Sequence, residues 1–171
     1  MDQLWSPWRY NFISKGQPSG GCVFCQIAAH NADNDDATHF VLRRARFNFI
    51  ILNLYPYTSG HLMVVPYAHL ATLENAPEET AAEMFRLTRE AERRLRKVYK
   101  PEGINIGMNI GACAGAGIAG HIHMHALPRW LGDANFMSVI GETRVLPETL
   151  ETTYRKLLAA FEDSENSIPE R

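Results

Sequence analysis

Three histidines alternate with apolar residues in the last third of the chain, as His121, His123 and His125. In a β-strand, residues two apart project from the same face, so this spacing predicts three imidazoles on one surface. The intervening Ile122 and Met124 would then face the core. Such a density of titratable groups on one strand indicates a chemical role rather than a structural one.

An imidazole can act as a nucleophile toward phosphorus, as a general acid or base, or as a metal ligand. The spacing of the three histidines does not choose among these roles. The choice depends on the groups that the rest of the chain brings to the same face.

A second chemical motif is the pair Cys22 and Cys25, separated by two residues. In a chain with three cysteines and no secretory signal at its start, such a pair is typical of a metal site or a redox centre. A redox pair is the weaker interpretation because no βαβ pattern surrounds it. Two buried free thiols are the alternative to both. The remaining Cys113 is interpreted as a small apolar residue.

Strands and helices must position these groups. Alternation and turn residues predict strands at 39–43, 47–53, 61–67, 104–110 and 120–127. A long helix follows Pro77 and stops before Pro101, with Glu83 among the acids that a helix N-terminus prefers. Its buried stripe is Met84, Thr88, Ala91, Leu95 and Val98, and a second helix from Pro147 buries Leu150, Tyr154, Leu157 and Phe161. This order predicts an α+β fold with a mainly antiparallel sheet.

The composition is that of one ordinary globular domain. The chain has 171 residues, 46% of them hydrophobic and 21% charged, and a net charge of −2, which gives no basic field for nucleic acid. We expect no secretory signal and no membrane span, and therefore a cytoplasmic protein. The predicted organisation is an N-terminal arm (1–21), one domain (22–161) and a flexible tail (162–171), with a polar surface loop at 30–38.

The histidine strand resembles a family signature. The run His121-Ile122-His123-Met124-His125-Ala126-Leu127 is similar to the His-φ-His-φ-His-φ-φ motif of the histidine triad (HIT) superfamily, where φ is apolar. An upstream strand and turn, 53–66, is similar to the family's nucleotide-binding segment. Further matches at Trp5-x₂-Trp8-Arg9 and at 128–137 resemble a bacterial branch that includes diadenosine tetraphosphate phosphorylases. The resemblance implies a five-stranded antiparallel sheet, which pairs with a second subunit's sheet into ten strands in a homodimer.

The resemblance also implies roles for individual residues. His123 would attack an α-phosphorus and form a nucleotidyl-histidine intermediate, and His125 would contact the phosphate oxygens. Asn53 matches a position that hydrogen-bonds ribose hydroxyls. His61 matches a position beside the triad, where we expect it to support the site.

The glycine-rich segment 111–120 precedes the triad and can offer backbone N–H groups to an anion, although a plain hairpin connection is the alternative. Around Ala116 and Gly117 the chain departs from much of the family, which has Gly-Gln-Ser or Gly-Gln-Thr there. The missing side-chain donors leave the second substrate open, as water or inorganic phosphate. Asn109 is the candidate for a side-chain contact to phosphate. Trp130 either stacks on adenine or packs at a sheet edge or dimer interface.

The resemblance extends to a zinc site. Similar proteins complete a Cys-x₂-Cys pair with two histidines, at positions that match His69 and His121. Four protein ligands, Cys22, Cys25, His69 and His121, leave no open coordination position, so the zinc would be structural. The sequence leaves open whether Mg²⁺ accompanies the nucleotide.

These features predict an enzyme that cleaves dinucleoside polyphosphates, with an adenine dinucleotide or mononucleotide as its ligand and no nucleic-acid or membrane partner. A nucleoside phosphoramidate hydrolase would use the same intermediate. A hydrolase with catalytic metal, held by the histidines, and a nucleotide-binding regulator without turnover are the competing classes. Loss of turnover with retained binding on replacing His123 distinguishes the first from the others.

Overall fold

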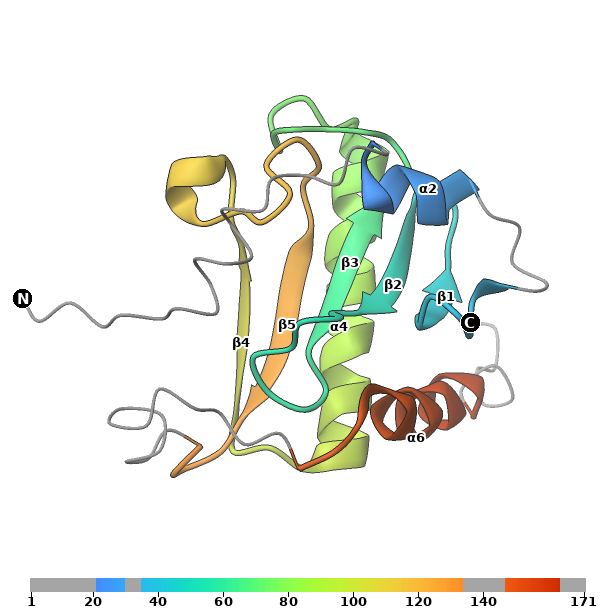
Figure 1. The fold of residues 1–171 in the computed structure, drawn as a ribbon, viewed down its shortest axis with the longest axis vertical. Helices are drawn as coiled ribbons and strands as arrows, with labels where there is room; N and C mark the ends of the chain where they lie inside the picture. The colour runs from blue at the N-terminus through green and yellow to red at the C-terminus, as the bar shows by residue number, and fades with distance from the viewer. Residues whose placement is uncertain (1–20, 30–34, 134–146, 164–171) are drawn as a thin grey trace, which may run out of the picture.

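The computed structural model describes residues 21–29, 35–133 and 147–163, and within them five strands form one antiparallel sheet (Figure 1). The order across the sheet is β1-β2-β3-β5-β4, and every neighbouring pair is antiparallel. The strands are β1 (Val41–Arg44), β2 (Asn48–Leu52), β3 (Leu62–Pro66), β4 (Gly103–Met108) and β5 (Met124–Arg129). The predicted α+β fold with an antiparallel sheet is confirmed.

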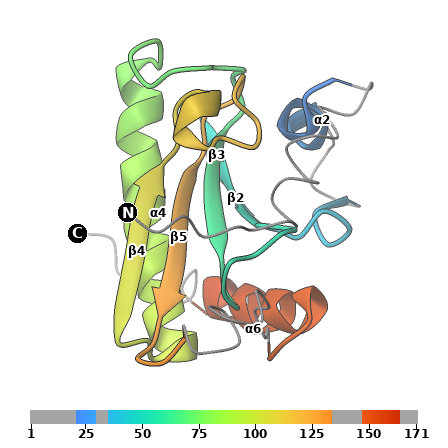
Figure 2. The same ribbon diagram turned by 60° about the vertical axis from the view of Figure 1, so that its left-hand side comes forward.

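Helices cover the sheet on both sides. The long helix α4 (Glu78–Tyr99) lies along one face, and α2 (Val23–Ala29) lies over the other (Figure 2). Helix α6 (Leu150–Glu162) packs against α4 and β1, and its N-cap Thr149 accepts a hydrogen bond from the backbone N–H of Thr152. A short 3₁₀ helix, η1 (Ala112–Ala114), lies within the glycine-rich segment. No described helix is long and apolar enough to cross a membrane.

Three strands differ from the prediction in their bounds, two of them for local reasons. Strand β1 begins at Val41 rather than at 39, because Phe40 has a φ of 57° and cannot continue an extended strand. Strand β5 runs from Met124 to Arg129 rather than from 120 to 127. The N–H groups of His121 and Ile122 bond to the carbonyls of Ile118 and Leu70, outside the ladder. Likewise β4 ends at Met108 rather than at 110.

The core divides into two clusters, one on each face. The larger lies between the sheet and α4 and α6, and it includes Ile122, Met124 and Ala126. The smaller lies between the sheet and α2, and it includes Phe24, Ile27, Val41, Phe49, Ile51, Met63 and Val65. The apolar residues of the triad run therefore face the core, as predicted, and the histidines take the opposite side.

One buried carboxylate joins the long helix to the β1–β2 hairpin. Glu83 of α4 is 5% exposed and accepts hydrogen bonds from the backbone N–H groups of Arg46, Phe47 and Asn48, at 2.7–3.2 Å. The Nδ2 of Asn48 donates to it as well. These bonds lower the pKa of Glu83 despite its burial. The acid predicted to serve the helix terminus is therefore a tertiary contact.

The predicted arm (1–21) and tail (162–171) lie almost wholly outside the described residues, as do Trp5, Trp8 and most of the loop predicted at 30–38. Those boundaries stay predictions.

Candidate functional site

The structure gathers four histidines on the α2 side of the sheet. His121 and His123 lie on the approach to β5, His125 lies in β5, and His61 directly precedes the neighbouring β3. All four are at most 9% exposed. The rings of His123 and His125 lie 4.8 Å apart, and those of His125 and His61 lie 5.0 Å apart. The predicted placement of the three imidazoles on one surface agrees with this arrangement.

The backbone fixes the tautomer of His123. Its Nδ1 lies 2.9 Å from the carbonyl oxygen of His121, which can only accept, so Nδ1 carries the proton. The Nε2 atom then bears the lone pair. Burial lowers the pKa of His123, which keeps the ring neutral near pH 7. A neutral imidazole with a free Nε2 is competent as a nucleophile.

His61 and His125 form an ordered pair. The backbone N–H of Tyr57 donates to Nδ1 of His61 at 3.2 Å, so the proton of His61 is on Nε2. That Nε2 donates to Nδ1 of His125 at 2.9 Å, which leaves His125 an N–H donor at its own Nε2. Burial lowers the pKa of His61 to about 3 and that of His125 to about 4. His125 thus presents a neutral donor beside the lone pair of His123.

Asn53 lies beside this pair. Its Nδ2 is 3.3 Å from Nδ1 of His61, and its Oδ1 accepts from the backbone N–H of Tyr55. The sequence prediction placed Asn53 and His61 in one nucleotide-binding segment, and the structure brings them together. Tyr57, which the sequence reasoning did not single out, stacks at a tilt on His61 with ring centroids 4.9 Å apart.

Strand β4 leaves open space beside the histidines. Gly107 pairs with His125 across the ladder, and a Cβ added at Gly107 would meet nothing within 4 Å. Continuing the register by one residue puts Asn109 opposite His123, on the same face. Asn109 is half-buried, as a residue at the rim of a site would be.

The glycine-rich segment uses part of its backbone internally. The N–H groups of Ala114, Gly115 and Ala116 bond to carbonyls of Gly111 and Ala112. Such a turn cannot present these three groups to an anion at the same time.

The neighbouring Gly117 is exposed, and no such internal bond of its N–H is found among the described residues. Of the two phosphate-binding candidates in this segment, Gly117 therefore has a backbone N–H available for a phosphate, whereas the N–H of Ala116 is used internally.

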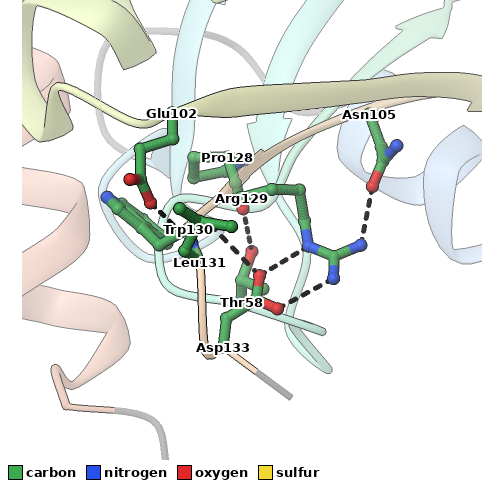
Figure 3. Close-up of polar contacts among 8 residues, drawn as sticks. All are labelled: Thr58, Glu102, Asn105, Pro128, Arg129, Trp130, Leu131 and Asp133. Atoms are coloured by element: carbon green, nitrogen blue, oxygen red, sulfur yellow. Dashed lines mark hydrogen bonds and ion pairs between the residues drawn. The ribbon is translucent and has the colours of Figure 1, made fainter.

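Trp130 lies beyond the far end of β5 from the histidines. Its ring meets that of Tyr99 on α4 edge-on, with centroids 6.3 Å apart. Arg129 holds this turn through Asp133 and Asn105, and Thr58 donates to the carbonyl of Pro128 (Figure 3). The distance along the strand from His125, at about 3.3 Å per residue, is roughly 17 Å, so Trp130 does not lie at the triad.

Four potential metal ligands meet at the other end of the site. The Sγ and Nδ1 atoms of Cys22, Cys25, His69 and His121 all lie within 4.8 Å of one another. Among the described residues, no other group of three or more such side chains comes this close together.

The closest sulfur–nitrogen distances in this group are 3.2–3.6 Å. A tetrahedral Zn²⁺ with usual bond lengths separates S and N ligands by about 3.6 Å. His121 Nε2 donates to the carbonyl of Pro66 at 2.9 Å, which leaves its Nδ1 lone pair directed at the sulfurs. Burial and the neighbouring Cys22 raise the pKa of the Cys25 thiol, so a cation is needed to stabilise thiolates here. The donor set and its spacing fit zinc.

Helix α2 connects the two parts of the site. Its Phe24 packs against the rings of both His121 and His123, with centroids 5.3 and 5.1 Å away. Cys22 directly precedes α2 and Cys25 lies in it, so two of the four potential metal ligands and the wall behind His123 come from one short segment. The sequence reasoning did not predict α2, since seven residues give too little periodicity.

Comparison with known proteins agrees with this geometry. The model of the HIT domain matches residues 35–130, more than half of the chain. The chain belongs to the HIT family. A HIT-family relative from Mycobacterium tuberculosis (strain H37Rv), named AP-4-A phosphorylase, is 39% identical over 163 residues, which make up 93% of this chain and 83% of the relative. The predicted superfamily, and the branch that this relative represents, are confirmed.

Solved structures of the HIT family share the fold. A Zn-bound histidine triad family protein from Mycobacterium smegmatis superposes with a TM-score of 0.69 and 31% identity, over 86% of this chain and 98% of that one. A hypothetical histidine triad nucleotide-binding protein from Sulfolobus tokodaii gives 0.67 and 25%, over 86% and 96%.

Proposed function

We propose that this HIT protein cleaves dinucleoside polyphosphates, of the diadenosine tetraphosphate type, by transferring a nucleotidyl group through His123. The single observation that carries the proposal is the fixed, neutral His123, whose Nδ1 is tied to a carbonyl and whose Nε2 is free. The similarity to a relative named AP-4-A phosphorylase supports the substrate class.

The reaction takes two displacements. Nε2 of His123 attacks the α-phosphorus, an N–P bond forms, and the P–O bond to the rest of the polyphosphate breaks. The donor at Nε2 of His125, with Asn109 and the N–H of Gly117, contacts phosphate oxygens, because phosphoryl chemistry asks mostly for positioning and charge stabilisation. Asn53 holds the ribose, and His61 holds His125.

A second acceptor then attacks the same phosphorus, and His123 leaves with its bonding pair. Inorganic phosphate would yield a nucleoside diphosphate, and water a monophosphate. The name of the Mycobacterium tuberculosis relative favours phosphate.

We propose in addition that the four potential metal ligands bind a structural zinc ion. Cys22, Cys25, His69 and His121 would hold it, and the zinc would neutralise the thiolates and pin α2 against the approach to β5. Its support is the fit of the donor distances and the Zn-bound relative. The described residues offer no comparable group for Mg²⁺.

We also propose a homodimer in which β4 edges pair into a ten-stranded sheet. In the single chain β4 is an edge strand, and its Asn105, Ile106 and Gly107 are exposed. An uncovered edge with an exposed isoleucine is suited to strand pairing.

The test is product analysis on diadenosine tetraphosphate, with and without inorganic phosphate. ADP plus ATP that require phosphate would establish phosphorolysis, and AMP plus ATP without phosphate would establish hydrolysis. His123→Ala should abolish turnover and keep substrate binding. Absence of cleavage by the wild type in both conditions would contradict the proposal and favour a phosphoramidate substrate or a binding role.

A further inference from the structure

The turn between β2 and β3 approaches the start of α6 (Figures 1 and 2). Residues of both segments line a cavity, and of these residues the proposed chemistry uses only Asn53 and His61. The volume of the cavity is about 260 Å³. At about 30 Å³ per water molecule this equals roughly nine waters, which is space for a heterocyclic base and far more than an ion needs. The walls include Leu54 and Ser59 from the turn, and Glu148, Leu150 and Thr153 from α6 and its approach.

The cavity contains a buried polar group with no internal use. Ser59 is 8% exposed, and its Oγ has no hydrogen-bond partner in the described part of the chain. A buried hydroxyl left unpaired is unfavourable, so nearly all such groups in folded proteins have a partner. A ligand in the cavity would supply one.

The same cavity is lined by the carboxylate of Glu148, which is positioned to accept a hydrogen bond. Oε2 of Glu148 accepts hydrogen bonds from the hydroxyls of Tyr99 and Thr153 at 3.3 and 3.4 Å. Its Oε1 forms an ion pair with Lys156 at 3.1 Å. These contacts fix the carboxylate and balance its charge. They leave lone pairs for a further donor.

The charges of the residues in and around the cavity indicate which kind of ligand it can bind. None of the described residues that line the cavity is a lysine or arginine, so the wall offers no cation to hold a phosphate. Because Lys156 already neutralises Glu148, a second cation gains little. The wall pair Leu54 and Leu150 suits a flat, apolar ring. The favoured ligand is an uncharged ring with an amino donor and a hydrogen-bonding edge.

We infer that this cavity binds the base of the substrate's second nucleoside, the one that leaves on the polyphosphate; this inference rests on the proposed function. The base's exocyclic amino group donates to Glu148, and Ser59 bonds to its polar edge. His61 lines the cavity and bonds to His125, and Asn53, which is proposed to hold the ribose of the transferred nucleotide, lines it as well. The polyphosphate chain that starts at His123 therefore has the cavity beside it.

The test compares two substrates with the full chain: diadenosine tetraphosphate, which has a second nucleoside, and adenosine 5′-phosphoramidate, which has none. The measured quantity is the ratio of their kcat/KM values. Glu148→Gln, which removes a charged acceptor, should lower the ratio about tenfold, and Ser59→Ala about threefold. The matched control Glu151→Gln, exposed on the first turn of α6, should keep the ratio within about twofold. An unchanged ratio in both cavity variants would overturn the inference.

A binding measurement separates this inference from the proposed function. Adenosine is titrated into the full chain with saturating AMP present, so that the histidine side is already occupied. Binding that weakens in Glu148→Gln and Ser59→Ala supports the cavity even if neither substrate is cleaved, in which case only the proposed function fails. Equal binding to both variants and the wild type, or none to any, would overturn the cavity assignment.

Discussion

The buried pair His61 and His125 should make the fold sensitive to acid. Both imidazoles are neutral in the folded protein, with pKa values of about 3 and 4, whereas an unfolded histidine titrates near 6.5. The unfolded chain therefore binds more protons between these values. Stability is full above pH 6.5 and is lost as the pH falls toward 4 and 3.

The magnitude follows from the number of protons. Between pH 5.5 and 4.5 each ring takes up close to one proton on unfolding, and each proton changes the free energy of unfolding by about 1.4 kcal/mol per pH unit. The two histidines together should thus lower the free energy of unfolding by about 3 kcal/mol between pH 5.5 and pH 4.5. His61→Gln keeps an amide donor for His125 and removes one titrating ring, so the slope should flatten by about 1.4 kcal/mol per pH unit.

The assay is urea unfolding of both proteins at intervals from pH 8 to pH 4.5. The residues of the proposed zinc site are the same in both proteins, so their titration cancels when the two profiles are subtracted. Above pH 7.5 the two profiles should run parallel, which is the internal control. Profiles that stay parallel down to pH 4.5 would refute the conclusion that His61 is buried as the neutral base.

Three further predictions follow from other parts of the molecule. Cys25→Ser should lose the zinc of the proposed site and have a lower Tm, whereas Cys113→Ser, exposed on η1, should change neither. Metal analysis and thermal unfolding measure the two effects. Full zinc retention by Cys25→Ser would count against the site. Gly107→Val should fold normally, because nothing lies within 4 Å of its Cβ, yet lower kcat/KM at least tenfold by filling the space beside His125. Gly103→Val at the far end of β4 is its control, and equal kinetics would contradict an open substrate path there. Glu83→Gln should lower the free energy of unfolding by about 1.5–3 kcal/mol, because it weakens bonds to three backbone N–H groups, and the exposed Glu79→Gln should cost under about 0.5 kcal/mol in the same urea titration.

Periodicity made most of the fold predictable from the sequence. The alternation around His123 fixed which residues face the core, and the helical stripe from Met84 to Leu95 located α4, because both patterns depend on burial against one face. Asn53 and His61 were linked by a family motif, and the structure places them in contact.

Tertiary contacts account for what the sequence did not reveal. Helix α2 has only seven residues, and its Phe24 and Ile27 pack against the sheet. No local sequence pattern indicates such a tertiary contact. The tautomers of His61 and His123 are set by a backbone N–H and a backbone carbonyl, which carry no side-chain signature. Glu83 looked like a helix-start acid because its partners lie more than thirty residues earlier in the chain.

The central claim, that His123 is a covalent nucleophile, is tested most directly by the stereochemical course at the α-phosphorus. The substrate is diadenosine tetraphosphate made chiral there by one sulfur, with the configuration of the released nucleotide as readout. Each in-line displacement inverts the phosphorus, so two displacements through His123 predict net retention. Net inversion would show a single direct transfer to the acceptor and contradict the nucleotidyl-histidine mechanism.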